Sequence, residues 1–265
     1  MTAISAGLVK ELRDQTGAGM MDCKRALEEA AGDLEAAKKL LRERGVAHAG
    51  KRAGRETTEG VVRSSIRGSV GAMVAVGCET EPVARNEEFL RFAERVLEAA
   101  VITRLGERLD ELEDERVELI GRIGENVAIR GTVCMEARDG EELAEYVHPP
   151  ANKIGVLLRA RGGSPQLARQ LAMHISFARP RFTTREQVPA EEVAAERAML
   201  AKQPDVAGKP EHVRDKIVEG RLEKWFAESV LADQEWIHDT SKRVGPALHE
   251  AGLEVVEFQR FALAE

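Results

Sequence analysis

The sequence predicts an α+β fold, because runs of strands that can pair in antiparallel fashion are flanked by helices, with no regular alternation of strand and helix. The chain of 265 residues contains 43% hydrophobic and 32% charged residues, which is typical of a globular protein rich in helix. Apolar residues recur at helical spacing near both ends, and they alternate with a period of two in the middle. Only 4% of residues are aromatic, so the core must consist mainly of Leu, Val, Ile and Ala.

Residues 1–46 are predicted to form a small three-helix domain. Turns at residues 16–19 and at Gly32 separate three apolar stripes, Asp33 is a plausible N-cap of the third helix, and Gly45 is its predicted end. Residues 47–58 carry glycines and many charges and are predicted to be a linker. The stripes are Ile4, Leu8, Val9 and Leu12, then Cys23, Ala26, Leu27 and Ala30, then Leu34, Ala37, Leu40 and Leu41.

Residues 59–139 are predicted to form the first half of a core domain. A hairpin of strands 61–66 and 70–78 comes first, and a helix follows with Asn86 as its N-cap. An acidic helix at about 107–122 and a strand at 127–135 complete this half. The buried stripe of the first helix comprises Phe89, Phe92, Ala93, Val96, Leu97, Ala100 and Val101.

Residues 140–189 and 230–265 are predicted to form the second half of the core, and 190–229 a helical hairpin that projects from it. The order strand, loop, helix occurs in both halves, which suggests that they are similar, although their sequence identity is faint. The last strand is expected to return to the core sheet. The predicted elements are strands 143–148, 154–160 and 254–263 and helices 166–178, 190–202, 211–231 and 242–251.

Charge and cysteine content limit the possible functions. The net charge of -7 and pI of about 5.6 make direct nucleic-acid binding unfavourable, because phosphate neutralisation needs clustered cations. One basic stretch is either a solvated helix end or a docking surface for an acidic partner. It comprises Lys38, Lys39, Arg42, Arg44, Lys51, Arg52 and Arg55.

Cys23, Cys78 and Cys134 are widely spaced and odd in number, so buried free thiols in a reducing compartment are expected. An enzyme that uses one of these cysteines is a weak alternative. No apolar run reaches membrane-spanning length, and the N-terminus lacks the features of a signal peptide. The sequence therefore predicts a cytoplasmic protein that does not bind membranes.

The most informative segment is 78–89, where an acidic loop containing Pro82 joins an apolar strand to an amphipathic helix. The loop is either a simple connection, with Pro82 fixing φ before a helix, or a rigid tip that contacts a partner. Met20 and Met21 raise a similar choice, since adjacent residues cannot both face one core, and we expect one of them to be exposed.

No catalytic, metal or cofactor site is predicted. The six histidines show no metal-ligand spacing, and residues 16–19 follow a helix and lack the lysine of a phosphate-binding loop. These observations favour a protein that acts by binding and deforming another protein.

Several motifs together resemble the translation elongation factor Ts family over nearly the whole chain. Residues 8–13 (LVKELR) followed by 16–27 (TGAGMMDCKRAL) carry the most specific similarity. The others, in the same order as in the family, are 78–80 (CET), 83–86 (VARN), 123–126 (IGEN), 208–210 (GKP), 217–221 (IVEGR) and Phe258, Arg260 and Phe261.

The resemblance implies a guanine nucleotide exchange factor for elongation factor Tu, with no active site of its own. It also implies an N-terminal domain similar to ubiquitin-associated modules and a core of two similar halves. The final strand and second half would hold another domain of elongation factor Tu. The implied partner-binding residues are Arg13, Met20, Met21, Glu79, Thr80, Glu81, Pro82 and His148.

The chain departs from the family where an Asp-Phe pair is expected to wedge near the magnesium site of the GTPase. Glu81 and Pro82 stand in place of that pair, so the acidic group is kept but most of the aromatic contact area is lost. The alternative is therefore a divergent paralogue that holds elongation factor Tu with weak exchange activity. The helical hairpin is also a candidate contact for a homodimer.

Overall fold

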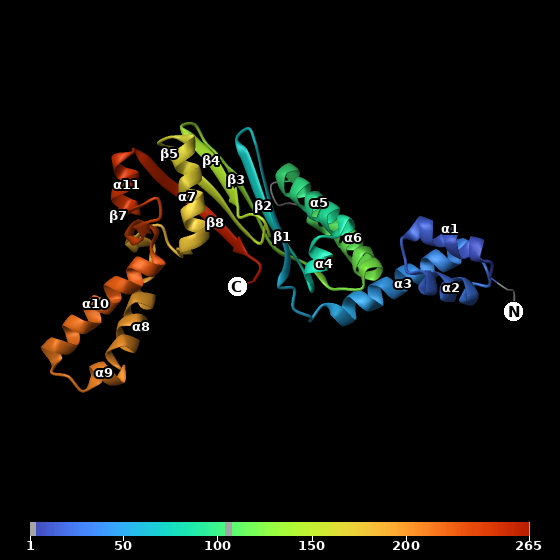
Figure 1. Cartoon of the computed structure of the whole chain (residues 1–265), viewed down its shortest axis with the longest axis horizontal. Coiled ribbons are helices and arrows are strands. Elements are labelled where there is room, and N and C mark those ends of the chain that lie inside the picture. Colours follow the sequence, from blue (N-terminus) through green and yellow to red (C-terminus); the bar gives the residue numbers. More distant parts are fainter. Residues whose placement is uncertain (1–3, 104–107, 265) are drawn as a thin grey trace.

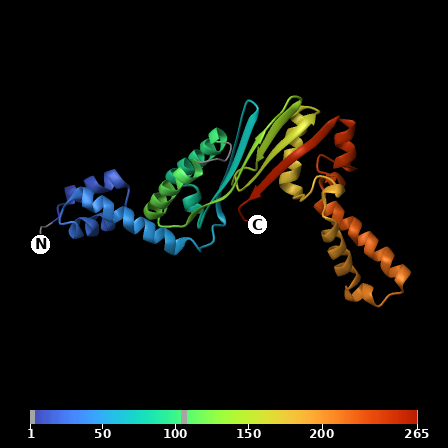
Figure 2. The same cartoon turned by 180° about the vertical axis from the view of Figure 1, so that it is seen from behind.

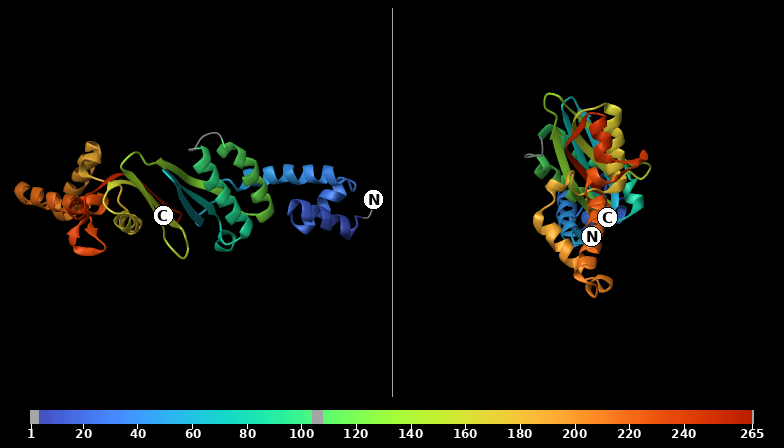
Figure 3. Two further views of the ribbon diagram at one scale, coloured as in Figure 1. Left: turned by 90° about the horizontal axis from the view of Figure 1, so that it is seen from above. Right: turned by 90° about the vertical axis from the view of Figure 1, so that its left-hand side faces the viewer.

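The computed structural model describes residues 4–103 and 108–264. A central body of two sheets, each covered by helices on its outer face, lies between two projecting helical parts (Figure 1). The N-terminal bundle extends from one end of this body and the helical hairpin from the other, as the reverse view also shows (Figure 2). Seen from above, the molecule is elongated (Figure 3). The α+β class predicted from the sequence is thus confirmed.

Three helices form the N-terminal bundle, each with the predicted buried face. Ser5 Oγ accepts a hydrogen bond from Leu8 N, and Asp33 Oδ1 accepts from Glu35 N and Ala36 N, so Asp33 is the N-cap that the sequence predicts. The helices are α1 (Ala6–Thr16), α2 (Met20–Glu29) and α3 (Leu34–Arg52), and their shared core comprises Val9, Leu12, Cys23, Ala26, Leu27 and Ala37.

The predicted end of the third helix at Gly45 is wrong, because α3 continues to Arg52 and replaces half of the predicted linker. Gly45 lies where α3 crosses another helix, α6 (Arg108–Ile123), and a Cβ added to Gly121 would lie 3.3 Å from Gly45 Cα. Here glycine permits a close helix crossing and does not end the helix. Arg42 pairs with Asp114 of α6 at 3.0 Å. The long α3 therefore connects the bundle directly to the central body.

The first sheet is antiparallel with β2 in the middle, and two helices cover its outer face. Asn86 Oδ1 accepts a hydrogen bond from Glu88 N at 2.8 Å, which confirms it as the cap of the following helix. The predicted stripe of that helix is confirmed, with Phe89, Ala93 and Val96 fully buried. The elements are β1 (Glu59–Arg67), β2 (Val70–Cys78), α4 (Glu81–Ala84), α5 (Glu87–Thr103) and β3 (Val127–Glu136).

The second sheet repeats this topology, with β5 in the middle and the final strand β8 paired to it, as the sequence predicts. In each half, helices are inserted between the central strand and the third strand. A short hairpin, β6–β7, was not predicted, because residues 239–243 of β7 are all polar or charged, are exposed, and show no apolar alternation. The elements are β4 (Glu141–Val147), β5 (Ile154–Gly162), α7 (Pro165–Ala178), β6 (Glu235–Trp236), β7 (Asp239–Arg243), α11 (Val244–Glu250) and β8 (Leu253–Ala262).

The two sheets pack against each other through their inner faces, so both faces of β2 are buried. Glycines permit the close approach: a Cβ added to Gly131 would lie 2.7 Å from the ring of Phe261 in the other sheet. The residues buried between the sheets are Val62, Met73, Ala75, Met135, Leu157 and Leu263.

The helical hairpin has a small core of its own, formed mainly by Val206, Val218 and Leu222. Arg221 of α10 pairs with Asp205 of α9, and Arg185 contacts both Glu223 and Asp233. None of the helices described is long and apolar enough to cross a membrane. The hairpin elements are α8 (Ala190–Ala201), α9 (Pro204–Ala207) and α10 (Glu211–Ser229), and two single turns flank the base, η1 (Arg185–Gln187) and η2 (Leu231–Asp233).

Candidate partner-binding site

The segment 79–82 is a bend followed by a one-turn helix, where the sequence predicts a loop. β2 ends at Cys78, the chain turns at Glu79 and Thr80, and α4 begins at Glu81. Pro82 occupies the first turn of α4, where its missing N–H is not needed for helical hydrogen bonding. Thr80, Glu81 and Pro82 are exposed, whereas Glu79 is half-buried and Ala84 is buried. The exposed part of this tip therefore runs from Thr80 into the start of α4.

Hydrogen bonds inside the chain hold the bend below the tip. Glu125 accepts from Thr80 N at Oε2 (3.0 Å) and from Thr80 Oγ1 at Oε1 (2.6 Å). Glu79 Oε1 accepts from Asn126 N at 2.6 Å, and Asn126 Nδ2 donates to Arg55 O at 2.8 Å. The polar side-chain atoms of Glu79 and Thr80 are thus engaged with residues across the bend, whereas the exposed Glu81 has its ion-pair partner, Arg85, at the end of α4.

The electrostatics of the tip are acidic, with partial compensation. Arg55 Nη1 lies 3.3 Å from Glu79 Oε2, and Arg85 pairs with Glu81 along α4.

Burial, together with the negative charge of Glu125, raises the pKa of the Cys78 thiol to about 12. Cys78 is therefore a neutral thiol at physiological pH, and it donates to Thr80 O at 3.3 Å. A neutral buried thiol is a poor nucleophile, which argues against a cysteine enzyme.

His148 lies at the end of β4 and is exposed, with its Nδ1 2.9 Å from Tyr146 Oη. The loop after His148 reaches the same end of the sheets as the tip. Lys153 Nζ lies 2.6 Å from Glu59 Oε2, and Glu59 is opposite Cys78 in the β1–β2 register. The fold therefore brings the predicted residues 79–82 and His148 to one end of the central body.

The other predicted contact residues lie on the N-terminal bundle. Arg13 is exposed in the last turn of α1, and Met20 and Met21 begin α2 after the turn at Gly17. Both methionines are exposed, by 58% and 62%, although only one was expected to be. Met20 shares the helical face of Cys23 by its spacing, but as the first residue of α2 it lies beyond the end of the bundle core. The bundle thus presents one exposed cation on α1 and two exposed, flexible apolar side chains on α2.

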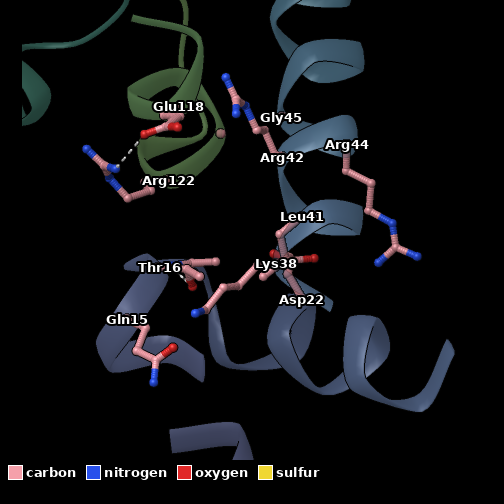
Figure 4. Close-up of a pocket in the computed structure, with 12 residues that line it drawn as sticks. Gln15, Thr16, Asp22, Lys38, Leu41, Arg42, Arg44, Gly45, Glu118 and Arg122 are labelled. Atoms are coloured by element: carbon pink, nitrogen blue, oxygen red, sulfur yellow. Dashed lines mark hydrogen bonds and ion pairs between the residues drawn. The ribbon is translucent and has the colours of Figure 1, made fainter. Parts of the chain in front are cut away.

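A cleft of about 270 Å³ separates the bundle from α6 (Figure 4). Thr16, Asp22 and Lys38 line the bundle side, and Glu118 and Arg122 line the α6 side. The basic stretch noted in the sequence runs along this region, and most of its cations have partners within the chain. Lys38 pairs with Glu35, Arg42 with Asp114, Arg44 with Glu29 and Arg55 with Glu79. These pairs favour a structural role for the stretch over a free docking surface.

Among residues 4–103 and 108–264, no group of three or more His, Cys, Asp or Glu side chains gathers in a way that could hold a metal ion. The chemistry that these surfaces offer is contact: an acidic tip, an exposed imidazole and a Met-rich patch. Glu125 and Asn126 were not predicted as site residues, and Arg55 was noted only as a member of the basic stretch. The signal for Glu125 and Asn126 was the family block at 123–126, to which spacing alone assigns no role.

Comparison with known proteins matches most of the chain to one family. The family model described as "Elongation factor TS" matches residues 79–265. Proteins named "Elongation factor Ts" from Erwinia tasmaniensis and Citrobacter koseri are each 41% identical over 268 residues, covering 100% of this chain and 93% of the relative. The protein of that name from Idiomarina loihiensis is 41% identical over 272 residues, covering 99% of this chain and 92% of the relative.

Proposed function

The chain belongs to the elongation factor Ts family, whose role is in translation elongation, and we propose that it is a guanine nucleotide exchange factor that promotes GDP release from elongation factor Tu. The observation that carries this proposal is the match over the whole chain, together with an exposed tip at the position of the family's wedge. The chain would perform no bond chemistry itself.

Exchange of this kind follows from linkage. An exchange protein that binds the nucleotide-free GTPase more tightly than the GDP-bound form lowers the affinity of the GTPase for GDP. Bound GDP lowers the affinity of the GTPase for the exchange protein by the same ratio. The exchange protein therefore needs contacts that only the nucleotide-free shape satisfies. A rigid tip suits that purpose, because a flexible one would adapt to either shape and give little differential affinity.

We assign the direct wedge contact to Glu81 and Pro82, since both are exposed on α4. Glu79 and Thr80 would act mainly by supporting α4, because their polar side-chain atoms bond within the chain. His148 lies at the same end of the body and would contact the nucleotide-binding domain there. Arg13, Met20 and Met21 would grip the GTPase from the bundle, where their exposed side chains provide adaptable contact area.

The Glu81-Pro82 pair gives a specific reason to expect a weaker wedge than the family's Asp-Phe. Fully burying a phenylalanine side chain contributes about 1.5–3 kcal/mol, and proline can recover only part of that. Because about 1.4 kcal/mol corresponds to a tenfold change in rate, exchange about tenfold slower than with an aromatic wedge is expected unless the partner has adjusted.

The alternative function is a holding or chaperone-like partner that binds elongation factor Tu with weak exchange activity. The observation that favours it is Pro82. We further propose that the chain is located in the cytoplasm, where it would meet elongation factor Tu. A homodimer contact through the hairpin, whose α8 and α10 border a groove, stays a prediction.

The deciding experiment follows release of fluorescent GDP from the cognate elongation factor Tu after mixing with excess unlabelled GDP. The chain at micromolar concentration should accelerate release, and the rate should saturate as its concentration rises. A Glu81→Ala variant should still bind elongation factor Tu through the bundle, but it should accelerate GDP release from elongation factor Tu less than the wild type does. No acceleration by the wild type would overturn the exchange function. A stable complex with an unchanged release rate would select the holding partner instead.

A further inference from the structure

We propose that Glu125 is a positioning residue for nucleotide exchange, because its carboxylate holds Thr80 by two hydrogen bonds and thereby sets the direction in which α4 faces the partner. This inference rests on the proposed function and adds to it a residue that does not itself touch the GTPase. We call the hydrogen-bonded residues Thr80 and Glu125, together with Glu79 and Asn126, the 79–126 clasp.

The need for an external support follows from the size of α4. It has four residues, and a helix of one turn has no stability of its own in water. Thr80 is its N-cap residue, yet the Thr80 side chain makes no capping hydrogen bond to α4. Its hydroxyl donates to Glu125 instead. The N-terminal end of α4 is therefore held from outside, by a carboxylate that comes from the opposite side of the bend.

The backbone on both sides of Glu125 is held in place. α6 ends at Ile123, and Gly124 adopts a φ of 84°, which reverses the chain and turns residues 125 and 126 toward the bend. Asn126 is only 3% exposed, and its N–H donates to Glu79 while its side chain donates to Arg55 O. The bend and the 124–126 turn thus exchange hydrogen bonds in both directions: residue 79 accepts from residue 126, and residue 80 donates to residue 125.

The far end of α4 has a different anchor. Ala84 is buried in the core beneath α5, and Asn86 caps α5. Loss of the clasp should therefore leave the body folded and free only the exposed N-terminal half of α4, which carries Glu81 and Pro82. That separation makes a positioning role distinguishable from a general role in folding.

The test compares Glu125→Ala, Glu125→Gln, Thr80→Val and the double variant Glu125→Ala/Thr80→Val in the full chain. Glutamine should retain function, because its carbonyl can accept from Thr80 N and its amide can donate to Thr80 Oγ. Glu98→Ala is the matched control, since it removes an exposed glutamate from the middle of α5. Three quantities are measured: GDP release from elongation factor Tu at increasing chain concentration, the melting temperature, and amide hydrogen exchange of the 78–86 segment.

The expected result is a loss of about tenfold or more in the saturating release rate for Glu125→Ala, because two hydrogen bonds to a charged acceptor are removed. The concentration for half-maximal release should change less, since the bundle contacts are intact. Thr80→Val should lose part of the rate, and the double variant should be no worse than Glu125→Ala within about twofold, because both changes act on one interaction. The 78–86 segment should exchange faster in Glu125→Ala and normally in Glu125→Gln.

An active wild type with an unchanged Glu125→Ala rate would overturn the positioning role and leave the exchange function standing. Equal losses in Glu125→Ala and Glu125→Gln would overturn it too, as would a loss that simply follows the melting temperature. If the wild type itself does not accelerate GDP release, the exchange function and this inference fall together.

Discussion

Gly155, at the start of β5, lies directly against Val62 of β1, so that a Cβ added to Gly155 would be 2.5 Å from Val62 Cγ1 and 2.9 Å from Met73 Sδ. This contact lies between the two sheets, and the β-branched Val62 side chain has little rotamer freedom with which to move away. We predict that Gly155→Ala lowers the free energy of unfolding by about 1–3 kcal/mol, as insertion of a methyl group into a packed interior does. Urea denaturation of the full chain measures this change.

The control is Gly220→Ala on α10. A Cβ at Gly220 meets nothing within 4 Å, and the residue is exposed inside a helix. Alanine should therefore stabilise the chain by about 0.5–1 kcal/mol through backbone entropy. If Gly155→Ala proved as harmless as Gly220→Ala, the sheets would not be as closely packed as we describe.

The exposed methionines of the bundle should matter for binding and not for folding. We predict that Met20→Ser/Met21→Ser leaves the melting temperature unchanged, since 58% and 62% of these residues are already exposed. Affinity for nucleotide-free elongation factor Tu should fall about tenfold or more, because apolar contact area is lost on two residues. Isothermal titration calorimetry gives both the affinity and the stoichiometry.

Met199→Ser provides the comparison, since Met199 on α8 is 52% exposed but lies on the hairpin, far along the chain from the bundle. It should bind as tightly as the wild type. Equal weakening in the two variants would mean that surface hydrophobicity in general, and not the bundle patch, governs association.

Stability at acid pH should depend on His174 in α7. This side chain is fully buried, its Nε2 lies 2.9 Å from Gln234 Oε1, and its Nδ1 accepts from Ile237 N at 3.4 Å. Burial lowers the pKa of His174, and the nearby His238 acts in the same direction. As the pH falls below about 6.5, the unfolded chain therefore binds a proton at this histidine that the folded chain does not bind. The free energy of unfolding decreases as a result. The melting temperature should drop between about pH 7.5 and about pH 5.

His174→Gln should reduce this dependence on pH, whatever its effect on stability at neutral pH, because the titrating group is gone. His249→Gln, at an exposed position on α11, should keep the wild-type dependence. If the melting temperature of His174→Gln fell with pH as steeply as that of the wild type, other groups would cause the acid sensitivity.

The elements that the sequence predicted well are those whose signal is local. The stripe around Phe89 and Phe92 and the Asn86 cap could be read from spacing alone. The end of α3 could not, because Gly45 lies inside the helix at a close contact with Gly121, which is remote in the sequence. The burial of both faces of β2 was likewise hidden, since the second face is covered by a sheet that begins at Glu141.

The candidate site shows the same division. A proline in an acidic loop is visible locally, but it left a simple connection and a contact tip both open, and only the family resemblance pointed to Glu81 and Pro82. The sequence did not reveal that Glu79 and Thr80 bond within the chain, because their partners Asn126 and Glu125 are more than 40 residues away. Nor could spacing show that both Met20 and Met21 are exposed, which depends on where the bundle core ends.

Pro82→Phe tests the wedge directly. Pro82 is exposed in the first turn of α4, so a phenylalanine there has room to extend into a partner, and it adds the aromatic area that the family's Asp-Phe pair supplies. We predict that GDP release from elongation factor Tu quickens by about tenfold, given about 1.5–3 kcal/mol for a buried phenylalanine.

Pro82→Ala separates the added ring from the loss of proline. It removes the φ restriction without adding apolar area, so release should not quicken, and a looser tip would slow it. If Pro82→Phe and Pro82→Ala gave the same rate as the wild type, α4 would not be the element that disturbs the nucleotide site. Exchange would then depend on the other predicted contact surfaces, which are the bundle, His148, and the second half of the core with its final strand.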